Sequence, residues 1–78
     1  MTLRIISATD IVFEGTVESV TLPGTKGRFT VLPRHAALVS TLTKGEIYYR
    51  TPDSVEHTAE ADGGLVDVVN DVVSVCIY

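Results

Sequence analysis

A chain of 78 residues has room for one domain around one hydrophobic core, so we expect a single domain over residues 1–78. Its residues are 45% hydrophobic and 21% charged, which is too apolar for disorder, and no apolar run approaches the roughly 20 residues that span a bilayer. The net charge of −4 argues against nucleic acid or a membrane surface as the main partner, because both bind a concentrated basic surface.

The first residues and the cysteine count bear on the compartment. The opening "MTLRIISATD" has no apolar stretch of about 7 to 15 residues and no small-residue cleavage site, so we expect no signal peptide. The single cysteine, Cys76, cannot form a disulfide within the chain, which fits a reducing compartment. Because Cys76 lies in an apolar alternation, we expect its side chain in the core. These features predict a soluble cytoplasmic domain.

Short runs rich in Val, Ile, Thr and Tyr alternate along the chain with clusters of Gly, Pro, Asn and Asp. Period-two runs bounded by turn residues are typical of β-strands, and no segment indicates a helix. Their regular spacing predicts an all-β fold, a small antiparallel β-sandwich of about nine or ten short strands. The predicted strands cover residues 3–7, 11–14, 16–22, 28–32, 39–42, 46–50, 55–60, 65–69 and 72–78.

Glycines and irregular spacing interrupt this pattern at several places. Gly15 predicts a bulge or sharp bend, and the three-residue step from Val17 to Val20 predicts one extra residue bulging there. The segment "PGTKG" at 23–27 predicts a turn, because its proline presets φ and its two glycines permit positive φ. Residues 55–60 form the most polar run, which is typical of an edge or one-sided strand.

A lone histidine and a tyrosine pair are each compatible with a structural role or a binding role. His35 either offers a ring nitrogen to a backbone group in a turn, or docks a neighbouring subunit at the start of the apolar step "HAALV". Tyr48 and Tyr49 point to opposite faces of a strand, so one joins the core and the other is ordinary surface or an interface anchor. The basic pair Lys26 and Arg28 is too small to track a phosphate backbone.

Residues that carry chemistry are too few for a catalytic, metal or nucleotide site. His35 and His57 are the only histidines and Cys76 is the only cysteine, without the spacings of a zinc site. No G-x-S-x-G nucleophile elbow is present, and the glycine pattern "GTKGRF" precedes no helix whose amino terminus could cradle a phosphate. We therefore expect no enzyme activity, no cofactor, no metal and no small-molecule substrate.

A long central stretch carries a family pattern. Residues 13–49, "FEGTVESVTLPGTKGRFTVLPRHAALVSTLTKGEIYY", resemble the epsilon subunit of F-type ATP synthase, which is called delta in mitochondria. The family pattern is F-x-G-x-V-x-x-V-x-L-P-G-x-x-G-x-F-x-V-L-x-x-H-A-x-L, and "GGLVDVVNDVVSV" near the end resembles the family's closing hairpin. The matching residues are Phe13, Gly15, Val17, Val20, Leu22, Pro23, Gly24, Gly27, Phe29, Val31, Leu32, His35, Ala36 and Leu38.

The resemblance implies a non-catalytic rotor part. The family's domain is a β-sandwich in the central stalk, attached to the gamma subunit and resting on the ring of c subunits. The resemblance thus implies a peripheral protein at the cytoplasmic face of the cell membrane, which helps to couple proton or sodium flow to ATP synthesis. By position, the implied contact residues are, for gamma, His35, Ala36 and Leu38 and, for the c ring, Lys26, Gly27 and Arg28.

The sequence departs from the family at two places. Most members continue into a helical hairpin that can inhibit ATP hydrolysis and in some cases binds ATP. This sequence stops at Tyr78, so we expect assembly and coupling without those two functions. Some relatives carry a carboxylate where Arg28 stands, which leaves open the sign of a charge contact with the c ring.

Two alternatives to a rotor part come from other classes of protein. A lipoyl or biotinyl carrier domain is also all-β and of similar size, and it presents its modified lysine at a hairpin turn. Lys44 in "TLTKGEI" has that position but lacks the D-K-A or M-K-M context of such a lysine. A generic β-sandwich adaptor is the second alternative.

Overall fold

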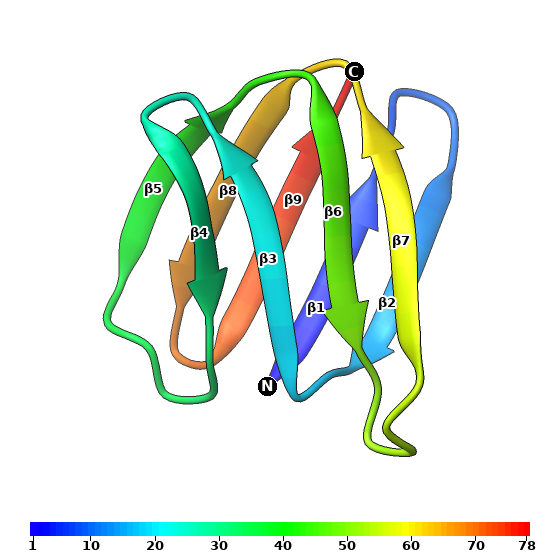
Figure 1. Cartoon of the computed structure of the whole chain (residues 1–78), viewed down its shortest axis with the longest axis vertical. Helices are drawn as coiled ribbons and strands as arrows, with labels where there is room; N and C mark the ends of the chain where they lie inside the picture. Colours follow the sequence, from blue (N-terminus) through cyan, green and yellow to red (C-terminus); the bar gives the residue numbers. More distant parts are fainter.

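Nine strands account for most of the chain in the computed structural model, which describes residues 1–78 and contains no helix (Figure 1). The predicted all-β class is confirmed, and each predicted strand is present with small shifts at its ends. The strands are β1 (Thr2–Ile6), β2 (Ile11–Thr16), β3 (Ser19–Gly24), β4 (Gly27–Val31), β5 (Leu38–Leu42), β6 (Gly45–Arg50), β7 (Glu56–Ala61), β8 (Gly64–Val69) and β9 (Val72–Ile77).

The strands form two layers. In Figure 1, β4, β3, β6 and β7 make the near layer, here called the four-stranded layer. Behind them β5, β8, β9, β1 and β2 make the five-stranded layer, and the two layers join where β5 meets β3 at the single pair Gly24 and Leu42. Neighbouring strands are antiparallel except β1 and β9, which run parallel. The predicted sandwich is thus confirmed, with one parallel pair that the strand pattern did not predict.

The core lies between the layers because strand residues alternate between the two faces of a sheet. β8 and β9 show this strictly, with buried and exposed residues in turn along each strand. No polar or charged residue is buried. Fully burying one Leu, Ile or Val side chain contributes about 1.5–3 kcal/mol, so this core holds the layers together. Its buried members are Leu3, Ile5, Val17, Val20, Leu22, Val31, Leu42, Ile47, Tyr49, Ala61, Val66, Val68, Val73, Val75 and Ile77.

Both bulges predicted near β2 are wrong. β2 runs through Gly15 in register with β1, and a Cβ at Gly15 would lie 3.2 Å from the Phe13 ring, so this glycine makes room for the ring. The irregular pairing of these strands lies instead beside Ile6. Val17 and Glu18 connect β2 to β3, and Val17 is buried. The broken alternation therefore marks a connection between the two layers.

Individual side chains on β9 and β6 give one correction and one confirmation. Cys76 is exposed, so the predicted core position is wrong. β9 turns Val75 and Ile77 inward, and the residue between them must then point outward. Tyr49 is buried and Tyr48 is half-buried, which confirms that one of the two rings joins the core. The most polar predicted strand is an edge strand, because β7 ends the strand order.

The connections between strands gather at the two ends of the sandwich (Figure 1). β4 runs from one end to the other, so the connections before and after it lie at opposite ends. The upper end in Figure 1 carries connections 7–10, 25–26, 43–44 and 62–63, and the lower end carries 17–18, 32–37, 51–55 and 70–71.

Candidate partner-binding surfaces

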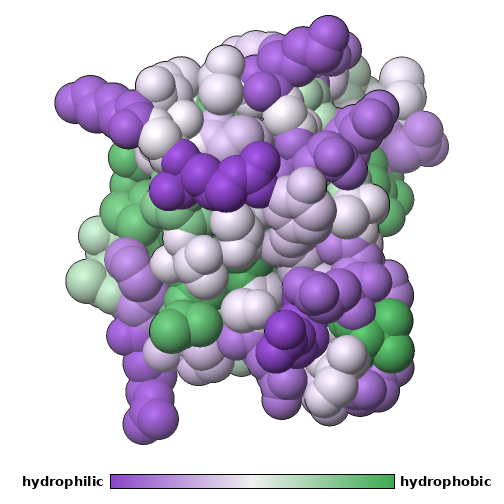
Figure 2. Space-filling model, in the orientation of Figure 1, coloured by the Kyte–Doolittle hydropathy of each residue, from purple (hydrophilic) through white to green (hydrophobic).

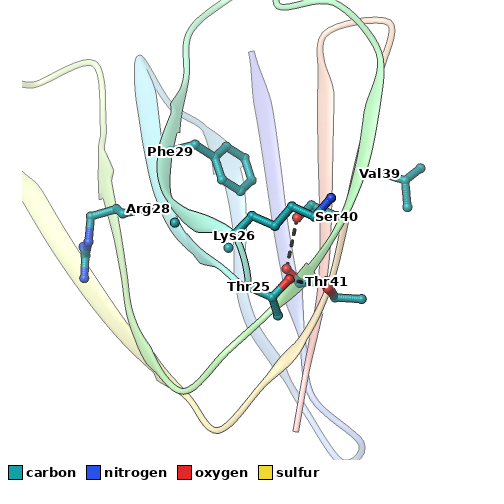
Figure 3. A pocket seen from close by; sticks show the side chains of 9 residues that line it. Thr25, Lys26, Arg28, Phe29, Val39, Ser40 and Thr41 are labelled. Atoms are coloured by element: carbon teal, nitrogen blue, oxygen red, sulfur yellow. Dashed lines mark hydrogen bonds between the residues drawn. The ribbon is translucent and has the colours of Figure 1, made fainter.

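The turn between β3 and β4 is a tight hairpin, as predicted, but only Gly27 has the positive φ expected of its two glycines, and Gly24 is required by close packing. Gly27 has φ of 128°, a conformation that favours glycine. A Cβ on Gly24 would lie 2.7 Å from the Gly27 carbonyl oxygen and 2.9 Å from the Phe29 ring. Thr25 fastens the tip to β5, because its N–H donates to the Thr41 carbonyl at 3.1 Å and the two hydroxyls are 2.8 Å apart (Figure 3). The turn is therefore both exposed and firmly held.

The two cations of this turn point to different sides, as Figure 3 shows. The guanidinium carbon of Arg28 lies 5.0 Å from the centroid of the Tyr48 ring, a cation–π contact on the outer face of the four-stranded layer. Lys26 lines a shallow hollow with Val39, Ser40 and Thr41 and makes no salt bridge. The structure thus places the three predicted c-ring residues in one exposed turn but separates their charges.

The loop at 32–37 is ordered by backbone and side-chain hydrogen bonds. The His35 N–H donates to the Leu32 carbonyl at 3.1 Å, and His35 Nδ1 lies 2.7 Å from the Ala36 carbonyl, so Nδ1 carries the proton. Arg34 has φ of 65°, and its N–H donates to Asp71 Oδ1 at 2.8 Å. The structural interpretation of His35 is confirmed. His35 and Ala36 are also exposed, so a docking role for both stays a prediction.

The third predicted gamma contact, Leu38, differs from the other two. It is half-buried and packs against the core, since it stands on β5 opposite the buried Val68. Its neighbour Val39 points outward and is 76% exposed. An apolar anchor for a partner needs an exposed side chain, and Val39 meets this requirement better than Leu38 does.

An exposed apolar surface crosses the outer face of the five-stranded layer. Leu65 on β8 pairs with Cys76 on β9, Cys76 pairs with Ile6 on β1, and Ile6 pairs with Ile11 on β2. Val39 on β5 lines a shallow hollow together with Leu65 and Cys76. We call these five residues the outer apolar patch. The sequence carried a signal for it, because "GLVDVV" and "VVSVCI" place apolar residues on both faces of a strand.

The outer face of the four-stranded layer is polar. Figure 2 shows this face, where hydrophilic and intermediate residues cover most of the surface and apolar colour is limited to small groups. Thr30, Thr21, Tyr48 and Thr58 form one cross-strand row, and the hydroxyls of Thr21 and Thr30 lie 2.8 Å apart. Such a face can remain in contact with water.

An aromatic group lies on the inner side of β6 and extends to β7. The Tyr49 ring is 4.4 Å from the Phe13 ring and stacks on His57 with centroids 5.2 Å apart. Burial raises the pKa of the Tyr49 hydroxyl. His57 Nε2 lies 3.2 Å from the Thr51 hydroxyl, which also donates to the Asp53 carboxylate. That hydroxyl, followed by the Val55 N–H, holds the pKa of Asp53 below its usual value.

The remaining chemistry of the surface is sparse. No group of three or more His, Cys, Asp or Glu side chains is close enough together to hold a metal ion. Nothing helical in the structure has the length and hydropathy to cross a bilayer. Loops, a charged turn and an apolar patch are the features through which this domain can bind other proteins.

Comparison with known proteins identifies a family. A profile described as "ATP synthase, Delta/Epsilon chain, beta-sandwich domain" matches residues 1–77. The ATP synthase epsilon chain of a Nitratiruptor species is 41% identical over 66 residues, which cover 85% of this chain and 51% of the relative. That of Leptospira borgpetersenii is 33% identical over 75 residues, covering 96% and 58%. The chain thus spans about half the length of the curated relatives it matches.

Solved structures share the fold at low sequence identity. The mitochondrial ATP synthase of Euglena gracilis contains a chain that matches with a TM-score of 0.90 at 19% identity, over 96% of this chain and 48% of that one. A central stalk and c-ring structure from Tetrahymena thermophila gives 0.81 at 14% identity, over 97% and 61%. The family match leaves the carrier-domain alternative, with Lys44 as its modified residue, without support. The chain belongs to the delta/epsilon family of ATP synthase subunits, and the match lies in that family's β-sandwich domain.

Proposed function

We propose that this domain is a non-catalytic central-stalk part of an F-type ATP synthase, where it links the gamma subunit to the c ring. Family membership supports the proposal. The observation that carries it is the placement of the two loops that the family pattern marks, which lie at opposite ends of one sandwich (Figure 1). The sandwich measures 27 × 24 × 18 Å, so a single body separates the two loops.

The gamma contact is assigned to the 32–37 loop and to the outer apolar patch. His35 and Ala36 are exposed on the loop, which leads directly into β5 and so to Val39 in the patch. Leu38 packs against the core and so holds the start of β5 in place beside this contact. Exposed apolar patches of soluble domains mark protein interfaces, and the apolar centre of an interface excludes water.

The c-ring contact is assigned to the turn that contains Lys26, Gly27 and Arg28. Gly27 has no side chain, so the backbone of a neighbouring loop can approach it closely. Lys26 offers a cation free of any salt bridge, whereas Arg28 is held over Tyr48. The ring-facing contact is therefore positive, and it suits carbonyl or carboxylate oxygens on the c subunits.

The mechanical role follows from the construction of the sandwich. Ion flow through the membrane sector turns the c ring, and a closely packed core between two hydrogen-bonded layers deforms little under load. Rotation of the ring is thus passed on with gamma to the catalytic heads. The domain touches neither the nucleotide nor the coupled ion, so proton and sodium serve this role equally. It is held at the cytoplasmic face of the cell membrane through the complex.

The test is recovery of the protein with gamma and the c ring from detergent-solubilised membranes, followed by assays of two variants. His35→Ala should weaken gamma binding by about 1–2 kcal/mol, the scale of a moderate interface contact. Lys26→Glu should leave gamma affinity within about 0.5 kcal/mol, as exposed substitutions do, but reduce ATP-driven proton pumping. The opposite pattern would exchange the two loop assignments. Recovery only as a free monomer would overturn the proposal.

A further inference from the structure

One hydrogen bond links the 32–37 loop to a residue outside the loop. The Arg34 N–H donates to Asp71 Oδ1 at 2.8 Å, and these residues are 37 positions apart. The other bonds of this loop, from His35 to Leu32 and from the His35 ring to Ala36, stay within it. No salt bridge involves the loop. Apart from its covalent ends at β4 and β5, the loop is therefore fixed to the sandwich at Asp71.

Asp71 is itself firmly placed. It lies in the turn between β8 and β9, where Asn70 and Asp71 have φ of 50° and 64°. Its carbonyl accepts the Thr2 N–H at 3.0 Å, and its Oδ2 lies 3.4 Å from the Met1 amino group. The Arg34 N–H is the main cause that holds the pKa of the Asp71 carboxyl below its usual value, so the acceptor stays charged at neutral pH.

We infer that Asp71 is a positioning residue for the partner contact: its carboxylate holds the 32–37 loop in the geometry in which His35 and Ala36 meet gamma, without touching gamma itself. The inference rests on the proposed function. Arg34 has positive φ, which a residue with a side chain adopts only where its surroundings hold it there. A loop that is ordered before binding loses little conformational entropy when it binds, so the hydrogen bond from Arg34 to Asp71 raises the affinity for gamma.

Three variants separate the carboxylate from the backbone of the turn. Asp71→Gly removes the carboxylate while keeping a residue that tolerates the φ of 64°. Asp71→Asn keeps both an acceptor oxygen and tolerance of this φ, so it should restore most of the effect. Asn70→Gly is the matched control, because Asn70 shares the turn and its side chain takes no part in the bond between Arg34 and Asp71.

The first measurement is amide hydrogen exchange. Asp71→Gly should speed exchange of the Arg34 amide about tenfold, the factor expected for losing one hydrogen bond to a charged acceptor. The amides of Val66 and Val75 in the core should keep their rates in all three variants. If the exchange rate of the Arg34 amide were the same in Asp71→Gly as in wild type, the inference would be overturned.

The second measurement is gamma binding. Asp71→Gly should raise the Kd about tenfold, while Asp71→Asn stays within about threefold and Asn70→Gly stays unchanged. If wild type and Asp71→Gly bind gamma equally well while exchange at Arg34 rises, the inference is wrong and the proposed function stands. If wild type does not bind gamma, the proposed function fails, and the exchange data still report on the loop.

The wild-type protein offers a test that no folding defect of a variant can mask. The Arg34 amide proton should shift upfield as pH falls, with one midpoint below the usual aspartate value of about 3.9, because protonation of Asp71 weakens its acceptor. The His35 amide, bonded within the loop, should follow with a smaller shift. If the chemical shift of the Arg34 amide proton did not change with pH, the inference would be wrong, whether or not Asp71→Gly folds.

Discussion

The two layers are alike on their inner faces and different on their outer faces. Leu3 from the five-stranded layer and Leu22 from the four-stranded layer are both 0% exposed. On the outside, the five-stranded layer presents the outer apolar patch, whereas the four-stranded layer presents a row of threonines with Tyr48. Folding requires an apolar inner face, but an outer face only has to suit what it meets. The difference fits the proposal that the five-stranded layer meets a partner protein on its outer face, while the four-stranded layer meets water.

The largest expected effect tests the likeness of the inner faces. Leu3→Ala and Leu22→Ala should each lower the free energy of unfolding by about 2–5 kcal/mol, because each leaves a cavity in the shared core. Thr58→Ala on the outer face of the four-stranded layer should stay within about 0.5 kcal/mol. Urea denaturation with an unchanged m-value measures this. If either leucine variant lost less unfolding free energy than the outward-facing threonine variant, the layers would not share one core.

The next effect tests the difference between the outer faces. Leu65→Asp should weaken gamma binding by about 2–4 kcal/mol, since it puts a charge into the apolar centre of the proposed contact. Thr58→Asp puts the same side chain on the other face and should change gamma affinity by less than about 0.5 kcal/mol. Calorimetric titration of gamma measures both. Equal losses from the two variants would show that the apolar patch has no special role.

A thiol footprint sharpens the same comparison without disturbing the patch. Cys76 is exposed in the free domain, so a thiol reagent should modify it readily. Binding of gamma should slow that reaction at least about tenfold, because the centre of an interface excludes water. In a Cys76→Ser background, a cysteine introduced by Thr58→Cys should react at nearly the same rate with and without gamma. Protection at position 58 and not at 76 would reverse the assignment of the faces.

The smallest effect concerns Asp53, in the β6–β7 loop of the four-stranded layer. The pKa of the Asp53 carboxyl is lowered in the folded protein, so the ionised carboxyl stabilises the fold. This stabilisation is fully present at pH values above the unfolded-state pKa of about 3.9 and is lost as pH falls through the lowered pKa. Thr51→Val removes the main cause and should move the Asp53 midpoint upward. A pH titration of the Val55 amide by NMR reports it, because that N–H donates to Asp53 at 3.3 Å. A midpoint that stays in place would exclude Thr51 as the cause.

Local pattern predicted most of the fold. Nine period-two runs became nine strands, and the glycines of "PGTKG" became the hairpin they predicted, because turn and strand preferences act between neighbours in sequence. The misplaced features needed the tertiary arrangement. Gly15 reads as a break until the Phe13 ring is known to lie over it. Cys76 reads as core because its neighbours are apolar on both faces of β9.

The candidate surfaces were predicted in outline and missed in detail. The family pattern marks both loops, but it does not show that Leu38 faces inward and Val39 outward, since that depends on the pairing of β5 with β8. The bond from Arg34 to Asp71 joins residues 37 positions apart, and no local preference indicates it. The outer apolar patch draws on five strands, so it exists as a surface only after the layer has assembled.

The parallel pairing of β1 and β9 has a consequence for synthesis of this protein. β1 is the first strand of this domain to leave the ribosome, and its partner β9 is the last of the nine. The β1 edge that faces β9 thus stays unpaired through most of translation, and contacts so distant in sequence form slowly. A nascent chain with such an edge and a half-built core is a substrate for chaperones. This small domain should acquire its native fold only after its last strand has emerged.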